Sequence, residues 1–181
     1  MPRLLFLGGI PGAGKTTVAR ELEQRWSVIH VVASSLLEQR TGSEIYERRT
    51  ITDTVESETN QELIVSAYRR FVMNLECDWI LLDGHYIVPA MISLFPVKLQ
   101  TFLELEVAQY AILICDPRHS LERLASRGTL PTWGGSIERL QAYQDAELKH
   151  AHCIAAMTDQ SLMIVHDSDH AAEDLAVSLG W

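Results

Sequence analysis

The sequence has few basic residues, and lysine is the scarcest of the charged types. The 181 residues hold 15 lysines and arginines against 24 aspartates and glutamates, which gives a net charge of −9. Proteins that bind nucleic acid through its phosphates normally carry a basic excess. This balance therefore excludes a general nucleic-acid binder. Of the 15 basic residues 12 are arginines, whose planar fork suits phosphate oxygens, so a few of them are candidates for holding a phosphorylated ligand.

Long apolar runs and a leader pattern are also missing. No apolar stretch reaches the roughly 20 residues that a membrane-spanning helix needs, and the first three residues lead directly into an apolar strand, which argues against a signal peptide. Metal-ligand spacing is absent from the cysteines, so we expect them to be buried thiols in a reducing cytosol; they are Cys77, Cys115 and Cys153. These observations predict a cytoplasmic protein without a membrane segment.

Length and composition favour one domain. A chain of 181 residues with 47% hydrophobic and 22% charged residues is ordinary for a globular protein with a sizeable core. Internal repeats, linkers and low-complexity tracts are absent from the sequence. We therefore expect a single domain over residues 1–181.

The most informative motif is the glycine-rich run Gly9–Thr16, which has the pattern G-x-x-x-x-G-K-[ST]. It follows an apolar strand at 4–7 and precedes a helix expected at 16–26, as a phosphate-binding loop requires. Backbone N–H groups in such a loop form a nest for anionic oxygens, and the helix dipole adds positive potential. Lys15 can reach the β- and γ-phosphates, and the Thr16 hydroxyl can ligate Mg²⁺. The sequence therefore predicts ATP and Mg²⁺ as ligands.

Strands and helices alternate along the chain. We expect strands at 4–7, 28–33, 79–82, 110–115 and 162–165, and helices at 16–26, 63–75, 137–151 and 171–179. Residues 34–59 are polar and show no clear period, and residues 87–107 fit a strand or a helix equally well. Apolar strands that alternate with helices imply a parallel sheet covered on both faces. The expected fold is an α/β P-loop fold with three α/β/α layers and a five-stranded parallel sheet.

The carboxyl ends of parallel strands meet at one edge of a sheet, where ligands bind. The phosphate-binding loop, Ser34-Ser35, Asp83-Gly84-His85 and Asp116 all follow expected strands. We therefore expect these four features to lie on one rim.

Asp83 ends an apolar strand, and its carboxylate can hold Mg²⁺ opposite Thr16. The alternative is a helix N-cap or a turn aspartate, which we consider the weaker interpretation. His85 is a better candidate for orienting the acceptor than for a catalytic base. Asp116 precedes Pro117, which favours a helix N-cap over a catalyst.

Arg123 and Arg127 lie on or just after the helix expected behind Asp116. The residues that follow, 128–135, are rich in glycine and proline, as mobile loops often are. Arginines at the base of such a loop suit a short lid, near 124–136, that closes over the transferring phosphate. An ordinary surface loop is the alternative.

The chain resembles the nucleoside-monophosphate kinase superfamily, and most closely the archaeal-type adenylate kinases. The resemblance rests on the loop and its extension through Ala19, on Leu81–His85, and on Ala111–Pro117 with Leu121 and Arg123 behind it. The order and spacing of these segments hold over nearly the whole chain. The loop itself is shared by many families, and the aspartate-x-histidine motif at Asp83 is the more family-specific sign.

The resemblance implies roles for particular residues. The donor ATP would be bound by Gly9, Pro11, Gly12, Ala13, Gly14, Lys15, Thr16, Thr17 and Arg123. The acceptor would be bound by Ser34, Arg40, Arg48, Gly84 and His85, with an acceptor-binding arm near 34–59. The catalytic set would be Lys15, Asp83, Arg123 and Arg127, and the metal ligands Thr16 and Asp83.

One departure from the family leaves the acceptor open. The lid of these kinases usually carries further arginines where this chain has Thr132–Gly135; Arg127 is retained, and Arg139 is a distant substitute. The sequence therefore predicts an ATP- and Mg²⁺-dependent phosphotransferase, most simply an adenylate-type nucleotide kinase. A kinase of a non-nucleotide small molecule and an ATP-binding regulatory protein with weak ATPase activity are the alternatives. The oligomeric state is open.

Overall fold

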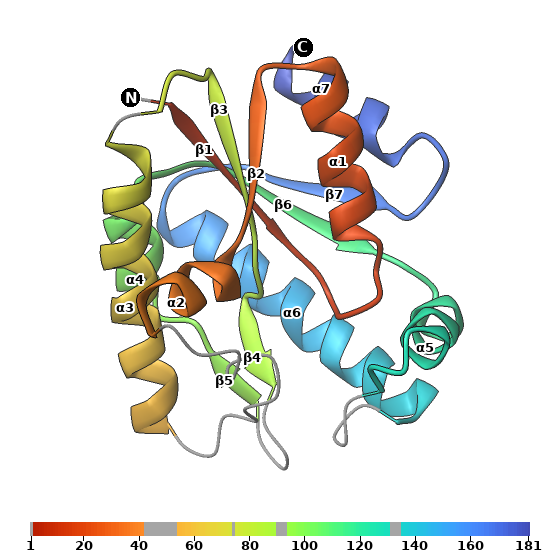
Figure 1. Ribbon diagram of the computed structural model, residues 1–181. Coiled ribbons are helices and arrows are strands. Elements are labelled where there is room, and N and C mark those ends of the chain that lie inside the picture. Colours follow the sequence, from red (N-terminus) through yellow and green to blue (C-terminus); the bar gives the residue numbers. More distant parts are fainter. Residues whose placement is uncertain (1, 42–53, 74, 90–93, 131–134) are drawn as a thin grey trace.

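The computed structural model describes residues 2–41, 54–73, 75–89, 94–130 and 135–181. A five-stranded parallel sheet lies at the centre, with the strand order β2-β3-β1-β6-β7 (Figure 1). The strands are β1 (Arg3–Gly8), β2 (Val28–Val32), β3 (Trp79–Asp83), β6 (Val107–Ile114) and β7 (Leu162–His166). The expected α/β fold with a five-stranded parallel sheet is confirmed.

The helices are α1 (Lys15–Arg25), α2 (Ala33–Thr41), α3 (Thr54–Val72), α4 (Leu99–Glu104), α5 (Pro117–Ser126), α6 (Ile137–Met157) and α7 (Ala171–Leu179). Helix α2 and the start of α3 lie within the stretch 34–59, which shows no clear period in the sequence. The ambiguous stretch 87–107 contains both kinds of structure, namely an antiparallel pair of short strands, β4 (Ile87–Pro89) and β5 (Leu94–Pro96), and then α4.

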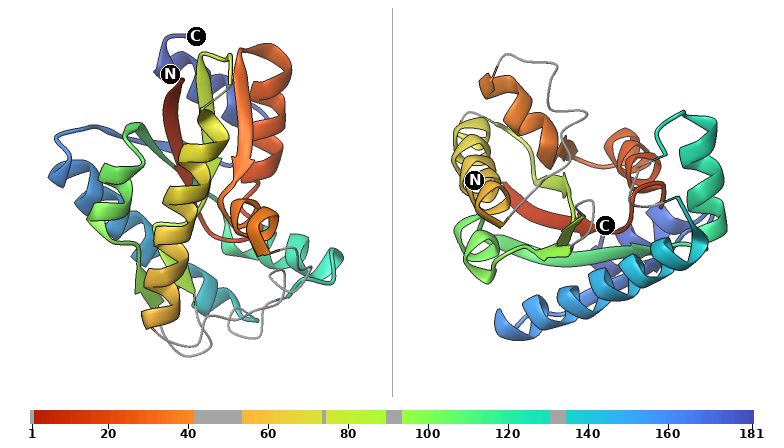
Figure 2. Two further views of the ribbon diagram at one scale, coloured as in Figure 1. Left: turned by 60° about the vertical axis from the view of Figure 1, so that its left-hand side comes forward. Right: turned by 90° about the horizontal axis from the view of Figure 1, so that it is seen from below.

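The sheet buries side chains on both faces because its strands are apolar at nearly every position. On β1, Leu5 and Leu7 pack with α1 and α7, whereas Leu4 and Phe6 pack with α3, α4 and the C-terminal half of α6. Figure 2 shows the two layers of helices from further sides. This two-sided burial leaves the carboxyl ends of the strands as the edge where polar groups gather.

The expected helix cap at Asp116 is confirmed. Its side chain accepts a hydrogen bond of 2.8 Å from the backbone N–H of Arg118, and Pro117 occupies the first turn of α5. This satisfies one of the amide groups that a helix start leaves without a partner.

The three cysteines differ in their surroundings, and the expectation of buried thiols is confirmed only for Cys115. Cys115 is buried at the end of β6, Cys77 is half-buried, and Cys153 is exposed on α6. The helical period explains the difference, because the apolar stripe of α6 runs through Ala151 and Ile154 and leaves Cys153 on the outer side. No helix in the described part of the chain is long and apolar enough to cross a membrane.

These surroundings predict a selective pattern of alkylation. Burial raises the pKa of the Cys115 thiol to about 11, so this thiol stays protonated and unreactive near pH 8. Iodoacetamide should therefore modify Cys153 in the folded protein and Cys115 only after unfolding, as measured by peptide mass spectrometry. In the variant Cys153→Ser most labelling should disappear. Equal labelling rates at Cys115 and Cys153 in the folded protein would contradict the burial of Cys115.

Candidate functional site

The glycine-rich loop joins β1 to α1 and depends on two positive backbone angles. Gly12 has φ +77° and Gly14 has φ +106°, conformations that side chains with a Cβ rarely adopt. A Cβ at Gly12 would also lie 2.8 Å from the carbonyl oxygen of Ser120. The Ser120 hydroxyl donates a hydrogen bond of 2.7 Å to the carbonyl of Pro11. Helix α5 therefore supports the loop from outside.

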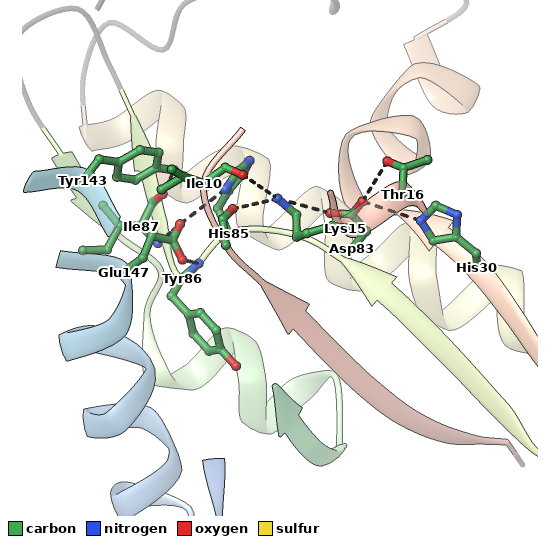
Figure 3. Close-up of polar contacts among 11 residues, drawn as sticks. Ile10, Lys15, Thr16, His30, Asp83, His85, Tyr86, Ile87, Tyr143 and Glu147 are labelled. Atoms are coloured by element: carbon green, nitrogen blue, oxygen red, sulfur yellow. Dashed lines mark hydrogen bonds and ion pairs between the residues drawn. The ribbon is translucent and has the colours of Figure 1, made fainter. Parts of the chain in front are cut away.

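Lys15, the first residue of α1, is buried within this loop. Its ammonium group donates to the carbonyl of Gly9 at 2.6 Å and lies 3.4 Å from that of Ile10 (Figure 3). The same nitrogen lies 3.6 Å from Oδ1 of Asp83. The Lys15 ammonium group thus contacts both the loop backbone and the carboxylate at the end of β3.

Asp83 is the last residue of β3 and is 7% exposed. The Thr16 hydroxyl lies 3.5 Å from its Oδ2, and Nε2 of His30 lies 3.6 Å from the same oxygen. Burial works to raise the pKa of Asp83, but the Lys15 ammonium and the His30 imidazole outweigh it and hold the pKa of this carboxyl below its usual value. Asp83 is therefore ionised at neutral pH, with its oxygens facing Thr16 and Lys15.

A cavity of 240 Å³ opens beside Asp83, between the sheet and helices α2, α3 and α4, and is called the apolar cavity below. Its walls are mostly carbon, and Phe6, Ile64 and Phe102 are among them. Polar groups enter it at few points, which are Ser34, Ser57, Asn60, Gln61, Asp83, Gly84, His85 and Thr101. No arginine or lysine is found among the described residues that line it.

A second cavity of 450 Å³ lies on the other side of the loop, between the starts of α1 and α7 and the length of α5, and is called the polar cavity. Gly14, Thr17, Arg123 and Arg127 line it. Arg123 donates to the carbonyls of Gly12 and Ala13, each at 3.2 Å, and forms an ion pair of 2.7 Å with Asp167. The loop therefore borders the polar cavity at Gly14, and it reaches the apolar cavity only through the contact between Lys15 and Asp83.

Helix α6 fixes the turn that follows Asp83. Glu147 is completely buried and accepts hydrogen bonds from the backbone N–H groups of Tyr86 (2.9 Å) and Ile87 (3.3 Å). Its carboxylate also lies 3.3 Å from Nδ1 of His85. The Tyr143 hydroxyl donates to the carbonyl of Ile87 at 2.6 Å and lies 3.2 Å from the same His85 nitrogen. This arrangement, drawn in Figure 3, orients the His85 ring at the mouth of the apolar cavity.

The sequence-predicted site residues divide between the two cavities. Ser34, Asp83, Gly84 and His85 line the apolar cavity, and Gly14, Thr17, Arg123 and Arg127 line the polar one. The side chain of Arg40 and the whole of Arg48 lie outside the described residues. Asp116 is exposed and belongs to neither cavity.

Three residues near the site are not predicted in the sequence analysis, although each has a recognisable feature in the sequence. Asp167 directly follows β7 and obeys the same strand-end rule as Asp83. Glu147 is a charged residue on the apolar stripe of α6, and His30 interrupts an otherwise apolar strand. A polar residue at a position patterned for the core is the informative exception.

Comparisons with known proteins agree with this geometry. The sequence model of the family described as "AAA domain" matches residues 8–159, most of the chain. The chain belongs to this family. Members of this AAA-domain family are P-loop proteins of the kinase type, which accounts for the loop, the parallel sheet and the strand-end aspartate.

The similar proteins match this chain either over a short segment or at low sequence identity. Adenylate kinase 9 of Mus musculus is 46% identical over 43 residues, which are 24% of this chain and only 2% of that protein. The shikimate kinase of Acinetobacter baumannii, solved in complex with shikimate, has a TM-score of 0.62 at 17% identity and covers 99% of this chain and 91% of its own. The shikimate kinase of Bacteroides thetaiotaomicron has a TM-score of 0.57 at 16% identity, with 99% of both chains covered. These structures show the fold that the chain shares with them.

The buried carboxylate of Glu147 predicts a specific loss of stability. Glu147→Ala leaves two buried N–H groups without an acceptor, so the free energy of unfolding should fall by about 2–4 kcal/mol, as measured by urea denaturation. Glu147→Gln retains one acceptor oxygen and should lose less. Glu122→Ala, at an exposed position on α5, is the control and should stay within about 0.5 kcal/mol of the parent. If Glu147→Ala and Glu122→Ala are equally stable, Glu147 does not support the turn.

Proposed function

We propose that this protein is an ATP- and Mg²⁺-dependent phosphotransferase that moves the γ-phosphoryl group of ATP to a small acceptor. One observation carries the proposal. The phosphate-binding loop borders the polar cavity at Gly14, and Asp83, which lines the apolar cavity, lies 3.6 Å from the ammonium group of Lys15 in that loop. A donor in the polar cavity and an acceptor in the apolar cavity would therefore meet near Lys15 and Asp83. In-line phosphoryl transfer needs such an arrangement.

The donor side would hold ATP through its phosphates. The backbone amides of residues 9–16 would surround the phosphate oxygens, and Lys15 would exchange its carbonyl partners for the β- and γ-phosphates. The nucleoside would extend into the polar cavity, which Arg123 and Arg127 line together with Glu21, Asp167 and Asp169. Their place at the base of residues 124–136 supports the proposal that this segment acts as a short lid.

Mg²⁺ fits the oxygen donors at the end of β3. The Thr16 hydroxyl and the ionised Asp83 carboxylate lie 3.5 Å apart, and both are the hard oxygen ligands that Mg²⁺ prefers. Bound there, the ion would neutralise charge on the phosphates. Asp83 and Thr16 would hold it directly or through water.

The acceptor would occupy the apolar cavity with its reactive oxygen toward Asp83. His85, fixed by Glu147 and Tyr143, would orient that oxygen toward the γ-phosphorus. The new bond joins this oxygen to the γ-phosphorus, the bond to the β-phosphate oxygen breaks, and ADP leaves. A hydroxyl acceptor would give its proton to Asp83 or His85, the two groups at the mouth that can take one.

The class of acceptor has two candidates. A nucleoside monophosphate, as in an adenylate-type kinase, is supported by the matching segment of adenylate kinase 9, and it would need the arginines expected in an arm near residues 34–59. A non-nucleotide molecule with a hydroxyl group is favoured by the carbon-rich cavity walls, because the described lining has no basic side chain to hold a phosphate. Two proteins of similar fold are shikimate kinases, and this supports a non-nucleotide acceptor.

Removing the Lys15 ammonium tests the donor side. Lys15→Ala should lower the rate of phosphoryl transfer by at least about a hundredfold, because the lysine stabilises charge on the transferring group. Lys149→Ala, on the exposed side of α6, should keep the parent rate. The measurement is acceptor-dependent ADP formation, with thermal melting to establish that both variants fold. A parent-like rate of acceptor-dependent ADP formation in Lys15→Ala would contradict this mechanism.

Filling the apolar cavity tests the acceptor side. Ile64→Trp replaces an aliphatic side chain of the cavity wall by a bulky aromatic ring. The acceptor KM should rise by tenfold or more, about 1.4 kcal/mol, while the affinity for ATP is unchanged. Val177→Trp, on the exposed face of α7, is the control. The acceptors to compare are nucleoside monophosphates and neutral small alcohols. If neither class raises ADP formation above the basal rate, the regulatory interpretation with weak ATPase activity replaces the kinase.

A further inference from the structure

His30 on β2 is a buried imidazole whose Nε2 lies beside Asp83 but makes no hydrogen bond within 3.5 Å to a described residue. Its side chain is 9% exposed, and Nε2 is fully enclosed without a hydrogen bond to any described residue. Buried polar atoms in native proteins are nearly always paired with protein, water or a ligand. A buried nitrogen that lacks a hydrogen bond and faces the Asp83 carboxylate therefore points to a group that binds between them.

The surroundings of His30 identify the chemistry of that group. Nε2 lies 3.6 Å from Oδ2 of Asp83, and the Thr16 hydroxyl lies 3.5 Å from the same oxygen. Ligands that share one ion at bond lengths of 2.0–2.2 Å stand about 3–3.5 Å apart. Figure 3 shows His30 and Thr16 both directed at the Asp83 carboxylate. His30 and Thr16 therefore each lie at this spacing from one carboxylate oxygen, Oδ2 of Asp83.

The other histidine at this rim is differently engaged. Nδ1 of His85 lies 3.2 Å from the Tyr143 hydroxyl and 3.3 Å from Glu147, so this nitrogen already has partners. Nε2 of His30 faces only Asp83, at 3.6 Å, and makes no hydrogen bond. Imidazole nitrogen is a good ligand for Mn²⁺, Co²⁺ and Zn²⁺, whereas Mg²⁺ prefers oxygen.

We propose that Nε2 of His30 is a direct ligand of the divalent cation at Asp83 and Thr16, which gives the site a nitrogen donor and a preference for transition-metal ions over Mg²⁺. The inference rests on the metal site of the proposed function and concerns which ion that site selects. A neutral imidazole with its proton on Nδ1 presents the lone pair that this role requires.

Pulsed electron paramagnetic resonance on the protein with Mn²⁺ and ADP tests the ligand directly. The wild-type spectrum should show modulation from a coordinated imidazole nitrogen. Incorporation of isotopically labelled histidine should shift that modulation, which distinguishes imidazole from the nitrogens of adenine and needs no substitution. His30→Gln should remove it, and His170→Gln, at the exposed N-cap of α7, should retain it. A wild-type spectrum without histidine coupling, or coupling that persists in His30→Gln, overturns the proposal.

Metal affinity gives a second readout. By calorimetry in the presence of ADP, His30→Gln should weaken Mn²⁺ binding by about ten- to a hundredfold and Mg²⁺ binding by a clearly smaller factor. Equal losses for the two ions would contradict a nitrogen ligand. If ADP does not bind the wild-type protein, the proposed function and this inference both fail. If ADP and Mn²⁺ bind without histidine coupling, only the inference fails.

Discussion

The ion pair between Lys15 and Asp83 is the interaction on which the site depends. A buried charge is costly unless it is paired, and these two side chains come from elements far apart in the sequence, the start of α1 and the end of β3. Their contact requires β1 and β3 to be parallel neighbours in register, with Leu7 beside Asp83. The sheet order thus places the phosphate-binding lysine against the strand-end carboxylate, and Thr16 and His30 gather around the same carboxylate.

The rest of the fold holds this pair beside the apolar cavity, and the loop that carries Lys15 borders the polar cavity at Gly14. Helix α5 supports the loop through Ser120 and Arg123, and α6 fixes the turn after β3 through Glu147. Both supports act on backbone groups, so the loop and the turn are held independently of any ligand. The polar cavity is lined by Arg123 and Arg127 together with acidic side chains such as Asp167, and the walls of the apolar cavity are mostly carbon.

The sequence predicted the sheet, the loop and the rim because each depends on a local pattern. Apolar strands, glycine spacing and residues at strand ends can all be read along the chain. Glu147 and His30 could not be assigned in this way, since their importance arises from partners far away in sequence. The same reason applies to the stretch 34–59, where Leu36 of α2 packs into the core although the sequence shows no strong helical period. The arginines Arg40 and Arg48 stay predictions, because the structure does not describe their side chains.

The central claim is that the loop and Asp83 join a donor site to an acceptor cavity. A crystal structure with Mg²⁺ and a non-hydrolysable ATP analogue tests this claim most directly. The account predicts the nucleoside in the polar cavity and the terminal phosphate beside Lys15, facing the mouth of the apolar cavity at Asp83 and His85. A terminal phosphate directed away from Asp83, or a nucleoside in the apolar cavity with its phosphates remote from the loop, would contradict it.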